Sequence, residues 1–354
     1  MMIFQILAIN ADFDGIMIGC FIDEEEMWRD FIPPLEGAPP SEAGYERSLE
    51  LTRGVLRHRG VEVGNLSAVV GSAGVIGPVS AGVFAVGERL FEALLKDQHP
   101  SSMGGVLAYA VSQPFGVRAF VVDPVSVDEM DEVARVTGLP ELARLPYDHA
   151  LACRALARRA ASDLGKEWPK MNLVVAYLNS AFSVCAFRGG RMAYVNNPDD
   201  SGPFSTKKAG GIVALDLARM VYGGQYSKDQ LVKRLTAEGG MAAHLGTADL
   251  ASVRRRIEAG DEKARLVYEA MAYNVAKEIG SCAAVLNGEV NAVIISGEVA
   301  RDASFVAQIQ DRVRWIAPVL CYPGKRELLA LAEGALRALT GVEPVGEFGD
   351  RIAS

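Results

Sequence analysis

The chain has 354 residues and a mass of 37.8 kDa, and 50% of its residues are hydrophobic and 23% charged. This is the composition of a soluble globular protein long enough for two domains. A formal net charge of −8 argues against a general nucleic-acid binder, which needs a basic surface.

Strand-like and helix-like stretches alternate along the chain. The stretches predicted as strands are rich in Val, Ile and Phe; they are 4–10, 16–23, 66–74, 117–126, 171–180, 182–197 and 290–297. Helices are predicted over 45–60, 149–168 and 259–286, where apolar residues recur at helical spacing. Proline and glycine predict a loop over 33–44.

The predicted strands fall into two groups, separated by the predicted helix near 148–168. Each group opens with an apolar strand, a short turn and a second apolar strand, at 6–24 and at 174–195. This repetition indicates a duplicated α/β fold with a ligand cleft between its halves.

The cysteines and the longest apolar runs bear on the compartment. Five scattered cysteines without CxxC spacing favour free thiols in a reducing compartment over a disulfide framework or a zinc site. No apolar run approaches ~18 residues, and no basic segment precedes an apolar core. We therefore expect a cytoplasmic protein without a signal peptide or a membrane span.

Five long segments carry a resemblance to a known family. They read VDPVSVDEMDEVARVTGLPELAR (122–144), NNPDDSGPFSTKKAGG (196–211), GGMAAHLGTADL (239–250), EAGDEKARLVYEAMAYNVAKEIG (258–280) and IAPVLCYPGKRELLALAEGALRAL (316–339). On these segments the chain resembles the butyrate kinases, within the superfamily of acetate and sugar kinases, heat-shock ATPases and actin. The resemblance covers nearly the full length.

The resemblance implies two RNase-H-like α/β domains around a central cleft, at 1–147 and 148–326. The second domain would carry a dimer interface, and the C-terminal helix, about 327–350, is a candidate to pack back on the first. The implied activity is magnesium-dependent transfer of a phosphoryl group from ATP to a short carboxylate.

The first phosphate turn departs from the family pattern. Where the family reads Asn-Pro-Gly-Ser-Thr-Ser-Thr-Lys, this chain reads NADFDGIM. Asn10 is retained, Asp12 and Asp14 replace a glycine and a hydroxyl residue, and Met17 replaces the lysine. Hydrogen-bond donors for phosphate oxygens have thus become carboxylates and apolar groups.

The second phosphate turn is altered in the same way. The family reads His-Leu-Gly-Gly-Gly-Ile-Ser and this chain reads YLNSAFS. Tyr177 replaces the histidine, Ser183 is retained, and the three glycines are replaced by Asn179, Ser180 and Ala181. Side chains at these positions hinder the close approach of the backbone to a phosphate.

Three further positions differ from the family. The adenosine-side turn Thr-Gly-Gly reads Ser-Gly-Glu, which keeps Gly297 and introduces Glu298. A substrate-gripping arginine is replaced by Ser72, and a second arginine by Lys208, which keeps the charge without the bidentate fork. The remnants of nucleotide binding are therefore Asn10, Ser183 and Gly297.

Several family positions persist. Asp123 matches a catalytic aspartate near the metal and the transferred phosphoryl group, and Glu327 matches a magnesium-associated glutamate. His99 and His149 match substrate-side positions, beside Ser72. The residues also admit structural roles: a strand-end cap for Asp123, a helix N-terminal acid for Glu327, and packing at a helix start for His149.

Our first hypothesis is a butyrate-kinase-like protein with a degenerate site, a pseudokinase that acts as a non-catalytic, regulatory or assembly subunit. It would bind no cofactor tightly, and would form a homodimer or a heterodimer with an intact kinase paralogue. Two alternatives stay open. One is an active carboxylate kinase or acyl or phosphoryl transferase that uses ATP and magnesium at Asp123, Glu327 and Lys208. The other is a cleft repurposed for a metal or a non-phosphorylated ligand, with Asp12, Asp14, Asp123 and Glu298 converging.

Overall fold

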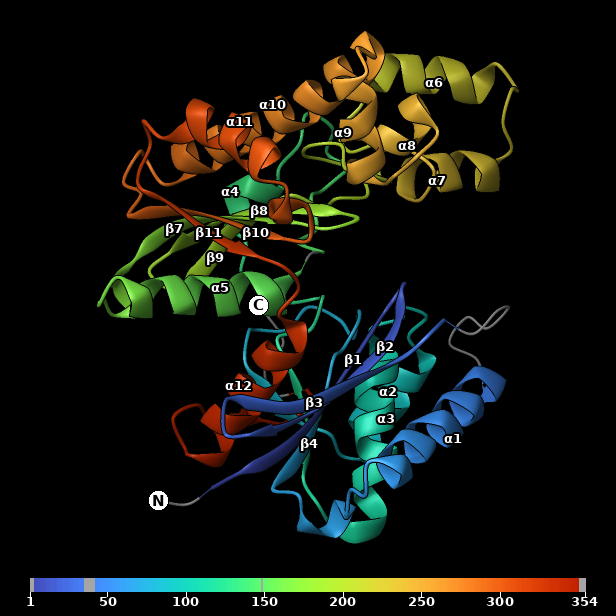
Figure 1. The fold of residues 1–354 in the computed structure, drawn as a ribbon, viewed down its shortest axis with the longest axis vertical. Coiled ribbons are helices and arrows are strands. Elements are labelled where there is room, and N and C mark those ends of the chain that lie inside the picture. Colours follow the sequence, from blue (N-terminus) through green and yellow to red (C-terminus); the bar gives the residue numbers. More distant parts are fainter. Residues whose placement is uncertain (1–2, 35–41, 148, 350–354) are drawn as a thin grey trace. The chain divides into compact units, whose positions relative to one another are not determined.

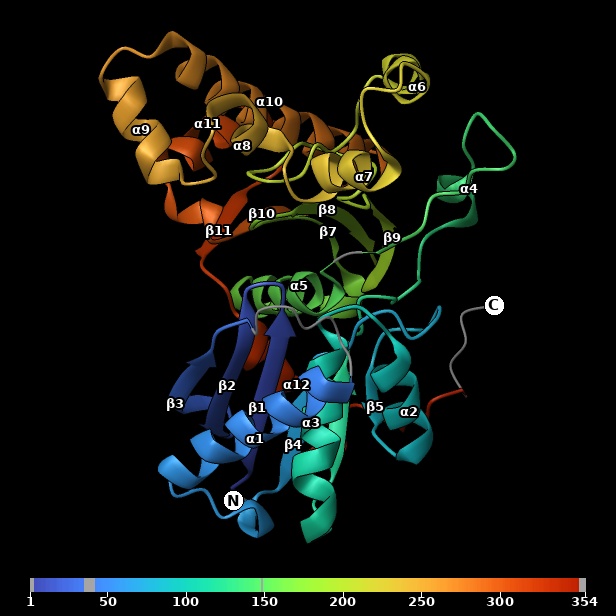
Figure 2. The same ribbon diagram turned by 90° about the vertical axis from the view of Figure 1, so that its right-hand side faces the viewer.

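A computed structural model describes residues 3–34, 42–147 and 149–349 of the chain (Figure 1 and Figure 2). The chain forms two compact units. The first consists of Met1–Asp128, Ala150–Ala152 and Arg326–Ser354, and the second of Glu129–His149 and Cys153–Lys325.

The segment 129–147 belongs to the second unit, and its start is hydrogen-bonded to β9 (Arg191–Val195). The backbone amide of Asp131 donates to the carbonyl of Ala193 at 2.9 Å, and the amide of Met192 donates to the Glu129 carboxylate at 3.0 Å. The predicted domain boundary, between residues 147 and 148, lies at the far end of this segment.

The first unit is built on a mixed sheet that, among the described residues, has the strand order β12-β5-β6-β4-β1-β2-β3. Its strands are β1 (Gln5–Asp12), β2 (Gly15–Ile22), β3 (Glu25–Ile32), β4 (Ala68–Gly71), β5 (Val83–Ala85), β6 (Ala119–Val122) and β12 (Val345–Gly346). Its helices are α1 (Glu42–His58), α2 (Glu88–Lys96), α3 (Ser102–Ser112) and α12 (Glu327–Leu339), with short 3₁₀ turns at Val63–Asn65 and Gln113–Phe115.

Strand β1 shows how this unit forms its core. Successive side chains of a strand point to opposite faces, and both faces of β1 are apolar and buried. Leu7 and Ile9 join the cluster that includes residues of α1 and α3, while Ile6 and Ala8 join the cluster formed with α12. The helix α12 therefore packs on this sheet although it lies more than 300 residues along the chain from β1.

The second unit has a five-stranded sheet over its described residues, in the order β11-β10-β7-β8-β9. Its strands besides β9 are β7 (Asn172–Leu178), β8 (Phe182–Arg188), β10 (Ala292–Gly297) and β11 (Val319–Pro323). Its helices are α4 (Glu132–Arg135), α5 (Ala150–Asp163, shared at its start with the first unit), α6 (Ala214–Tyr222), α7 (Lys228–Thr236), α8 (Gly240–Leu245), α9 (Leu250–Glu258), α10 (Glu262–Val285) and α11 (Ala303–Val313), with 3₁₀ turns at Trp168–Lys170 and Val299–Arg301.

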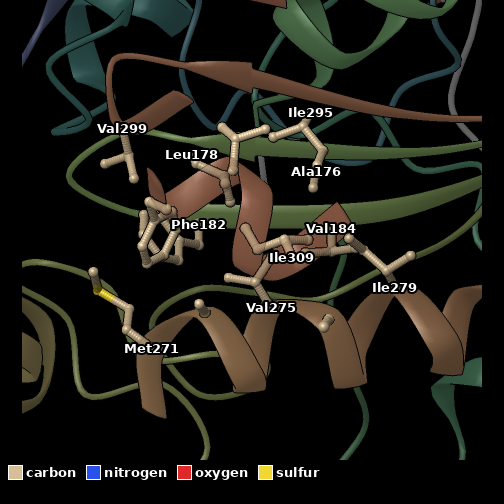
Figure 3. Close-up of a cluster of buried hydrophobic side chains, with 14 of the residues drawn as sticks. Ala176, Leu178, Phe182, Val184, Met271, Val275, Ile279, Ile295, Val299 and Ile309 are labelled. Atoms are coloured by element: carbon tan, nitrogen blue, oxygen red, sulfur yellow. The ribbon is translucent and has the colours of Figure 1, made fainter. Parts of the chain in front are cut away.

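The core of the second unit lies between its sheet and α10 (Figure 3). Met271, Val275 and Ile279 follow one another at helical spacing on α10, and their side chains point toward Phe182 and Val184 of β8. All five side chains are fully buried. Figure 1 shows α5 along the opposite face of the same sheet.

The two units share one strand arrangement. In the first, β1, β2 and β3 form an antiparallel meander, and β4 and β6 add to β1 in parallel. In the second, β7, β8 and β9 form the meander, and β10 and β11 add to β7 in parallel. Each unit also has a register irregularity at the middle strand of its meander, at Cys20/Phe21 and at Ala186/Phe187. The chain is thus an α/β protein with a duplicated fold, as the repeated hairpins predict.

No helix of the described residues is both long enough and apolar enough to cross a membrane.

Candidate functional site

The turn between β1 and β2 contains a hydrogen bond to the carboxylate of its own Asp12. Asp12 and Gly15 face each other across β1 and β2, so Phe13 and Asp14 form the two-residue turn. The backbone amide of Asp14 donates to Oδ1 of Asp12 at 2.7 Å, as aspartates in tight turns commonly do. This amide is therefore engaged by the chain itself.

The remaining residues of this hairpin have structural surroundings. Asn10 and Met17 are partners in the register of β1 and β2, and Met17 packs against the core cluster beneath α12. A methionine at this position fills apolar space, and it places no cation beside the turn.

His99 belongs to a network of short-range hydrogen bonds ahead of α3. Its backbone amide donates to Oδ1 of Asp97 at 3.1 Å, and its ring Nδ1 accepts from the amide of Ser101 at 3.3 Å. Oδ2 of Asp97 accepts from the Ser102 hydroxyl at 2.6 Å. The ring of the exposed Phe13 lies edge-on to His99, with centroids 5.6 Å apart.

Ser72 is buried beneath the start of α3. Its hydroxyl accepts from the amide of Ala11 at 3.0 Å and donates to the carbonyl of Ser101 at 2.8 Å. A Cβ atom added to Gly104 would lie only 2.3 Å from this hydroxyl. The short serine side chain therefore fills this space and makes hydrogen bonds as donor and as acceptor. The resemblance implies a substrate-gripping arginine at the same position.

Asp123 has an unusual backbone conformation. It follows β6 directly, is 3% exposed, and has a positive φ of 40°. Its Oδ1 accepts from the amide of Gly82 at 2.8 Å, and its own amide donates to the carbonyl of Gly82 at 2.9 Å. A non-glycine residue in the left-handed region is uncommon, and such strain often occurs at functional sites.

Glu327 is the first residue of α12 and is half-buried. A carboxylate at this position is favoured by the helix dipole. Among the residues that the structure describes, no group of three or more His, Cys, Asp or Glu side chains is placed to hold a metal ion.

In the second unit, the altered turns contact each other. Asn179, Ser180 and Ala181 connect β7 to β8. Asn179 is 6% exposed, and its Oδ1 accepts from the backbone amide of Glu298 at 2.8 Å. Two of the residues that replace family glycines, Asn179 and Glu298, are thus joined by a hydrogen bond.

The Glu298 carboxylate is itself engaged on both oxygens. Oε1 accepts from the amide of Lys325 at 3.0 Å, and Oε2 pairs with Nε of Arg301 at 2.8 Å. Gly297, immediately before it, has a φ of 98° and packs so closely on β7 that a Cβ atom would lie 2.2 Å from the carbonyl oxygen of Leu178.

His149 contacts two of the other predicted residues. Its Nδ1 lies 2.8 Å from the hydroxyl of Ser183, and its ring packs edge-on against Tyr177 at 5.2 Å between centroids. Ser183 is fully buried and Tyr177 is 1% exposed. These three side chains fill the space between the start of α5 and the sheet.

Lys208 forms an ion pair with Asp199. Its backbone amide and that of Lys207 donate to the hydroxyl of the buried Ser205, at 3.0 and 3.3 Å. The cation that replaces a family arginine therefore pairs with a carboxylate nine residues away on the same chain.

Sequence reasoning missed Asp97, Ser101, Asp199, Arg301 and Lys325, which contact the predicted residues directly. Each is close in sequence to one of them or to its partner, since Asp97 and Ser101 flank His99, and Arg301 follows Glu298 by three residues. A search for charged and hydroxyl residues within three positions of each predicted site residue would have identified Asp97, Ser101, Arg301 and Lys325, the last because it lies two residues before Glu327.

A carboxyl outside these turns gives a pH prediction. Burial raises the pKa of Glu278, and the hydrogen bond from the Tyr194 hydroxyl, at 2.9 Å, together with the positive charges of Lys277 and Arg144, offsets the shift only in part. The folded chain then binds this proton more tightly than the unfolded chain, whose glutamates titrate near ~4.3. Stability should fall as pH rises from the unfolded pKa through the raised folded one. In urea unfolding over this pH range, Glu278→Gln should remove that fall, and an unchanged slope would contradict the assignment.

Comparisons with known proteins agree with this architecture. The profile of the Acetokinase family matches residues 148–314. The chain is 39% identical to "Probable butyrate kinase 2" of Caldanaerobacter subterraneus subsp. tengcongensis and 37% identical to "Butyrate kinase 1" of Clostridium acetobutylicum. Both matches run over 353 residues, covering 98% of this chain and 100% and 99% of the two relatives.

Solved structures show the same fold. An acetate kinase from Porphyromonas gingivalis superposes with a TM-score of 0.78 at 14% identity, covering 94% of this chain and 99% of that one. A propionate kinase from Francisella tularensis subsp. tularensis SCHU S4 gives 0.77 at 15% identity, covering 94% and 98%. With the shared strand order of the two units and near full-length identity above 35%, the chain belongs to the butyrate kinase family, with the two-domain actin-like ATPase fold.

Proposed function

We propose that this member of the butyrate kinase family is a non-catalytic, regulatory or assembly subunit that does not use ATP efficiently. The observation that carries this proposal is that donors at its ligand turns are engaged by the chain's own side chains. The amide of Asp14 is bound by Asp12, the amide of Glu298 by Asn179, and the cation of Lys208 by Asp199.

The expected loss of catalysis is large. Removal of one donor to a transition state costs roughly 10²–10³ in rate, and loss of an arginine that stabilises phosphoryl charge costs roughly 10³–10⁵. Here a lysine position is Met17 and an arginine position is Ser72. The carboxylates of Asp12, Asp14 and Glu298 would also repel the phosphates of a nucleotide. These effects act together on one reaction and are not additive, but each lowers the rate.

Isothermal titration calorimetry with ATP and magnesium tests the proposal, alongside an assay of acyl phosphate formation from butyrate. We expect neither micromolar binding nor turnover. Butyrate kinase 1 of Clostridium acetobutylicum, measured in the same buffers, serves as the positive control. Micromolar binding together with turnover by this chain would refute the proposal.

One observation favours a second function, an active carboxylate kinase or transferase with a rebuilt site. Asp123 is a buried acid held in the left-handed region, and such strain persists where surrounding structure enforces it. In this case Asp123, Glu327 and Lys208 would act with ATP and magnesium on a short acyl substrate. Turnover in a screen of short-chain carboxylates and acyl phosphates, lost in Asp123→Asn, would establish this alternative.

The second unit exposes apolar side chains that support an assembly role. Helix α6 has no buried residue, and an isolated helix of this length is marginal in water. Its Tyr222 is 91% exposed and its Leu215 72% exposed. Figure 2 shows the segment with α4 extending beyond β9, and this segment exposes further apolar side chains, which are Val133, Val136, Leu139, Leu142 and Leu145.

We assign the exposed apolar side chains of α6 to contact with a second copy of the chain. The exposed apolar side chains at 212–222 and those at 133–147 are two groups in the same unit, and the first group lies on and beside α6. Exposed apolar side chains gathered on one helix are typical of sites where proteins associate. An identical chain is always present in equal number, and symmetric dimers are the commonest oligomers.

The double variant Leu215→Glu with Tyr222→Glu is expected to be monomeric in size-exclusion chromatography with light scattering, whereas the unaltered chain is expected to be dimeric. The matched control is Phe115→Glu, which places a charge on an exposed aromatic residue of the first unit. A dimer that survives the double variant would exclude α6 from the interface, and a monomeric unaltered chain would leave a heterodimer with a kinase paralogue as the occupant.

We also place the protein in the cytoplasm. No disulfide bond joins the five cysteines, and four of them are buried, as is usual where thiols stay reduced.

A further inference from the structure

Three turns of the second unit meet at Glu298. They are the β7–β8 turn at 179–181, the segment 297–301 after β10, and the segment 323–325 at the end of β11. We propose that Glu298 is an internal anion that occupies the oxyanion-binding groups of these turns, and so acts as an autoinhibitory contact. The proposal deepens the proposed function and rests on it.

The groups around this carboxylate are those that bind oxyanions in general. Lys325 supplies a backbone N–H at 3.0 Å from Oε1, and Arg301 supplies a guanidinium N–H at 2.8 Å from Oε2. Backbone amides and arginine are the common donors to phosphate and carboxylate oxygens. A phosphate-bearing anion would need the same donors, which Glu298 already engages.

The backbone beside Gly324 holds the Lys325 amide in place independently of the carboxylate. The amide of Gly324 donates to the carbonyl of Gly297 at 2.9 Å. The guanidinium of Arg301 lies against Gly324, where an added Cβ atom would be 2.7 Å from Nη2. Removal of the Glu298 side chain should therefore leave the donors positioned and open to a free anion.

The Glu298 carboxylate has an advantage over any dissolved anion. It is anchored by its own backbone amide, which donates to the buried Asn179 at 2.8 Å. Because the carboxyl carbon is tethered four bonds from this anchored amide nitrogen, the effective concentration of the carboxylate at the donors is of millimolar order or higher. A dissolved anion has to compete with it at every encounter.

The test uses the full chain, with pyrophosphate as the probe and potassium chloride at equal ionic strength as the reference. In Glu298→Ala, we expect pyrophosphate to raise the melting temperature above the chloride reference, because a ligand that binds only the folded state stabilises it. The unaltered chain should show no such rise. Glu269→Ala is the matched control, since it removes an exposed ion pair with Arg265 in the same unit and touches none of the three turns.

Hydrogen exchange supplies a second readout. Without pyrophosphate, the amide of Lys325 should exchange roughly tenfold faster in Glu298→Ala, because it loses an acceptor that carries charge. Glu298→Gln, which keeps an oxygen acceptor without the charge, should give a smaller increase and should still bind pyrophosphate less well than the alanine variant.

The outcomes separate the two proposals. If neither the unaltered chain nor Glu298→Ala responds to pyrophosphate, or if Lys325 exchange is unchanged, the internal-anion proposal is wrong and the non-catalytic role stands. If the unaltered chain binds ATP with magnesium and turns over butyrate, the non-catalytic role is wrong, whatever pyrophosphate does to the variant.

Discussion

Replacement of Gly297 by alanine is expected to destabilise the second unit by about 3 kcal/mol or more, the larger of two effects that we predict. Gly297 has a φ of 98°, which costs an alanine about 1–2 kcal/mol. The new Cβ atom would also lie 2.2 Å from the carbonyl oxygen of Leu178, and overpacking of this kind costs roughly 1–3 kcal/mol. Leu178 belongs to β7, so it cannot move without disturbing the strand pairing of β7 and β10.

Urea unfolding monitored by circular dichroism measures this loss, with Gly288→Ala as the control. Gly288 has a similar φ of 79°, but nothing lies within 4 Å of the position of its added Cβ atom. The control therefore carries the conformational cost of about 1 kcal/mol alone. Equal losses in the two variants would show that crowding against Leu178 is unimportant.

Replacement of Asp123 by alanine is expected to destabilise the first unit by about 2–3 kcal/mol. The variant leaves the amide of Gly82 without its side-chain acceptor, and a buried donor without a partner costs about 1–3 kcal/mol. Alanine also tolerates the φ of 40° less well than aspartate.

The variant Asp123→Asn separates the hydrogen bond to Gly82 and the backbone conformation of residue 123 from the negative charge of Asp123. Asparagine keeps an oxygen acceptor for Gly82 and accepts the left-handed region readily, so its melting temperature should lie close to that of the unaltered chain. Differential scanning fluorimetry should rank the asparagine variant well above the alanine variant. If both lose the same stability, the negative charge of Asp123, and not the hydrogen bond, stabilises the first unit.

The frame of the fold could be predicted from the sequence because its strands are continuous apolar runs. Strands β7 and β10 lie within predicted stretches, β1 and β2 overlap theirs to within two residues, and the repeat of a strand, a turn and a strand correctly indicated duplication. Of the predicted loop over 33–44, residues 35–41 lie outside the described residues, and α1 begins at Glu42.

Other elements carry weaker signals. Strand β3 reads EEMWRDFI and lies at the edge of its sheet. Its exposed, charged residues are common on edge strands, and they give no apolar run from which a strand could be predicted. Helices such as α6 and α7 bury no residue. Packing against a core therefore imposes no apolar pattern on their sequences. Pairing with a neighbouring strand stabilises β3, and capping stabilises short helices such as α7. A short window of sequence shows neither contact.

For the candidate site, the sequence identified the altered positions but not their new contacts. It predicted that Asn179 and Glu298 would hinder a nucleotide, and these residues are 119 positions apart and joined by a hydrogen bond. It treated Asp12 as a repulsive charge, and the structure adds a local role as acceptor for Asp14. The hydrogen-bond partner of each altered residue depends on which turns the sheet brings together at one edge. The spacing of residues along the chain does not specify this.

The exposure of α6 makes this helix a built-in reporter of association. Arg219 is a trypsin site within it, on a segment that no buried side chain fastens to the rest of the chain. In a dilute sample of separated chains, trypsin should cut here before it cuts the core helices, and raising the protein concentration should protect the bond. Timed digestion followed by mass spectrometry would then follow association without any label or substitution.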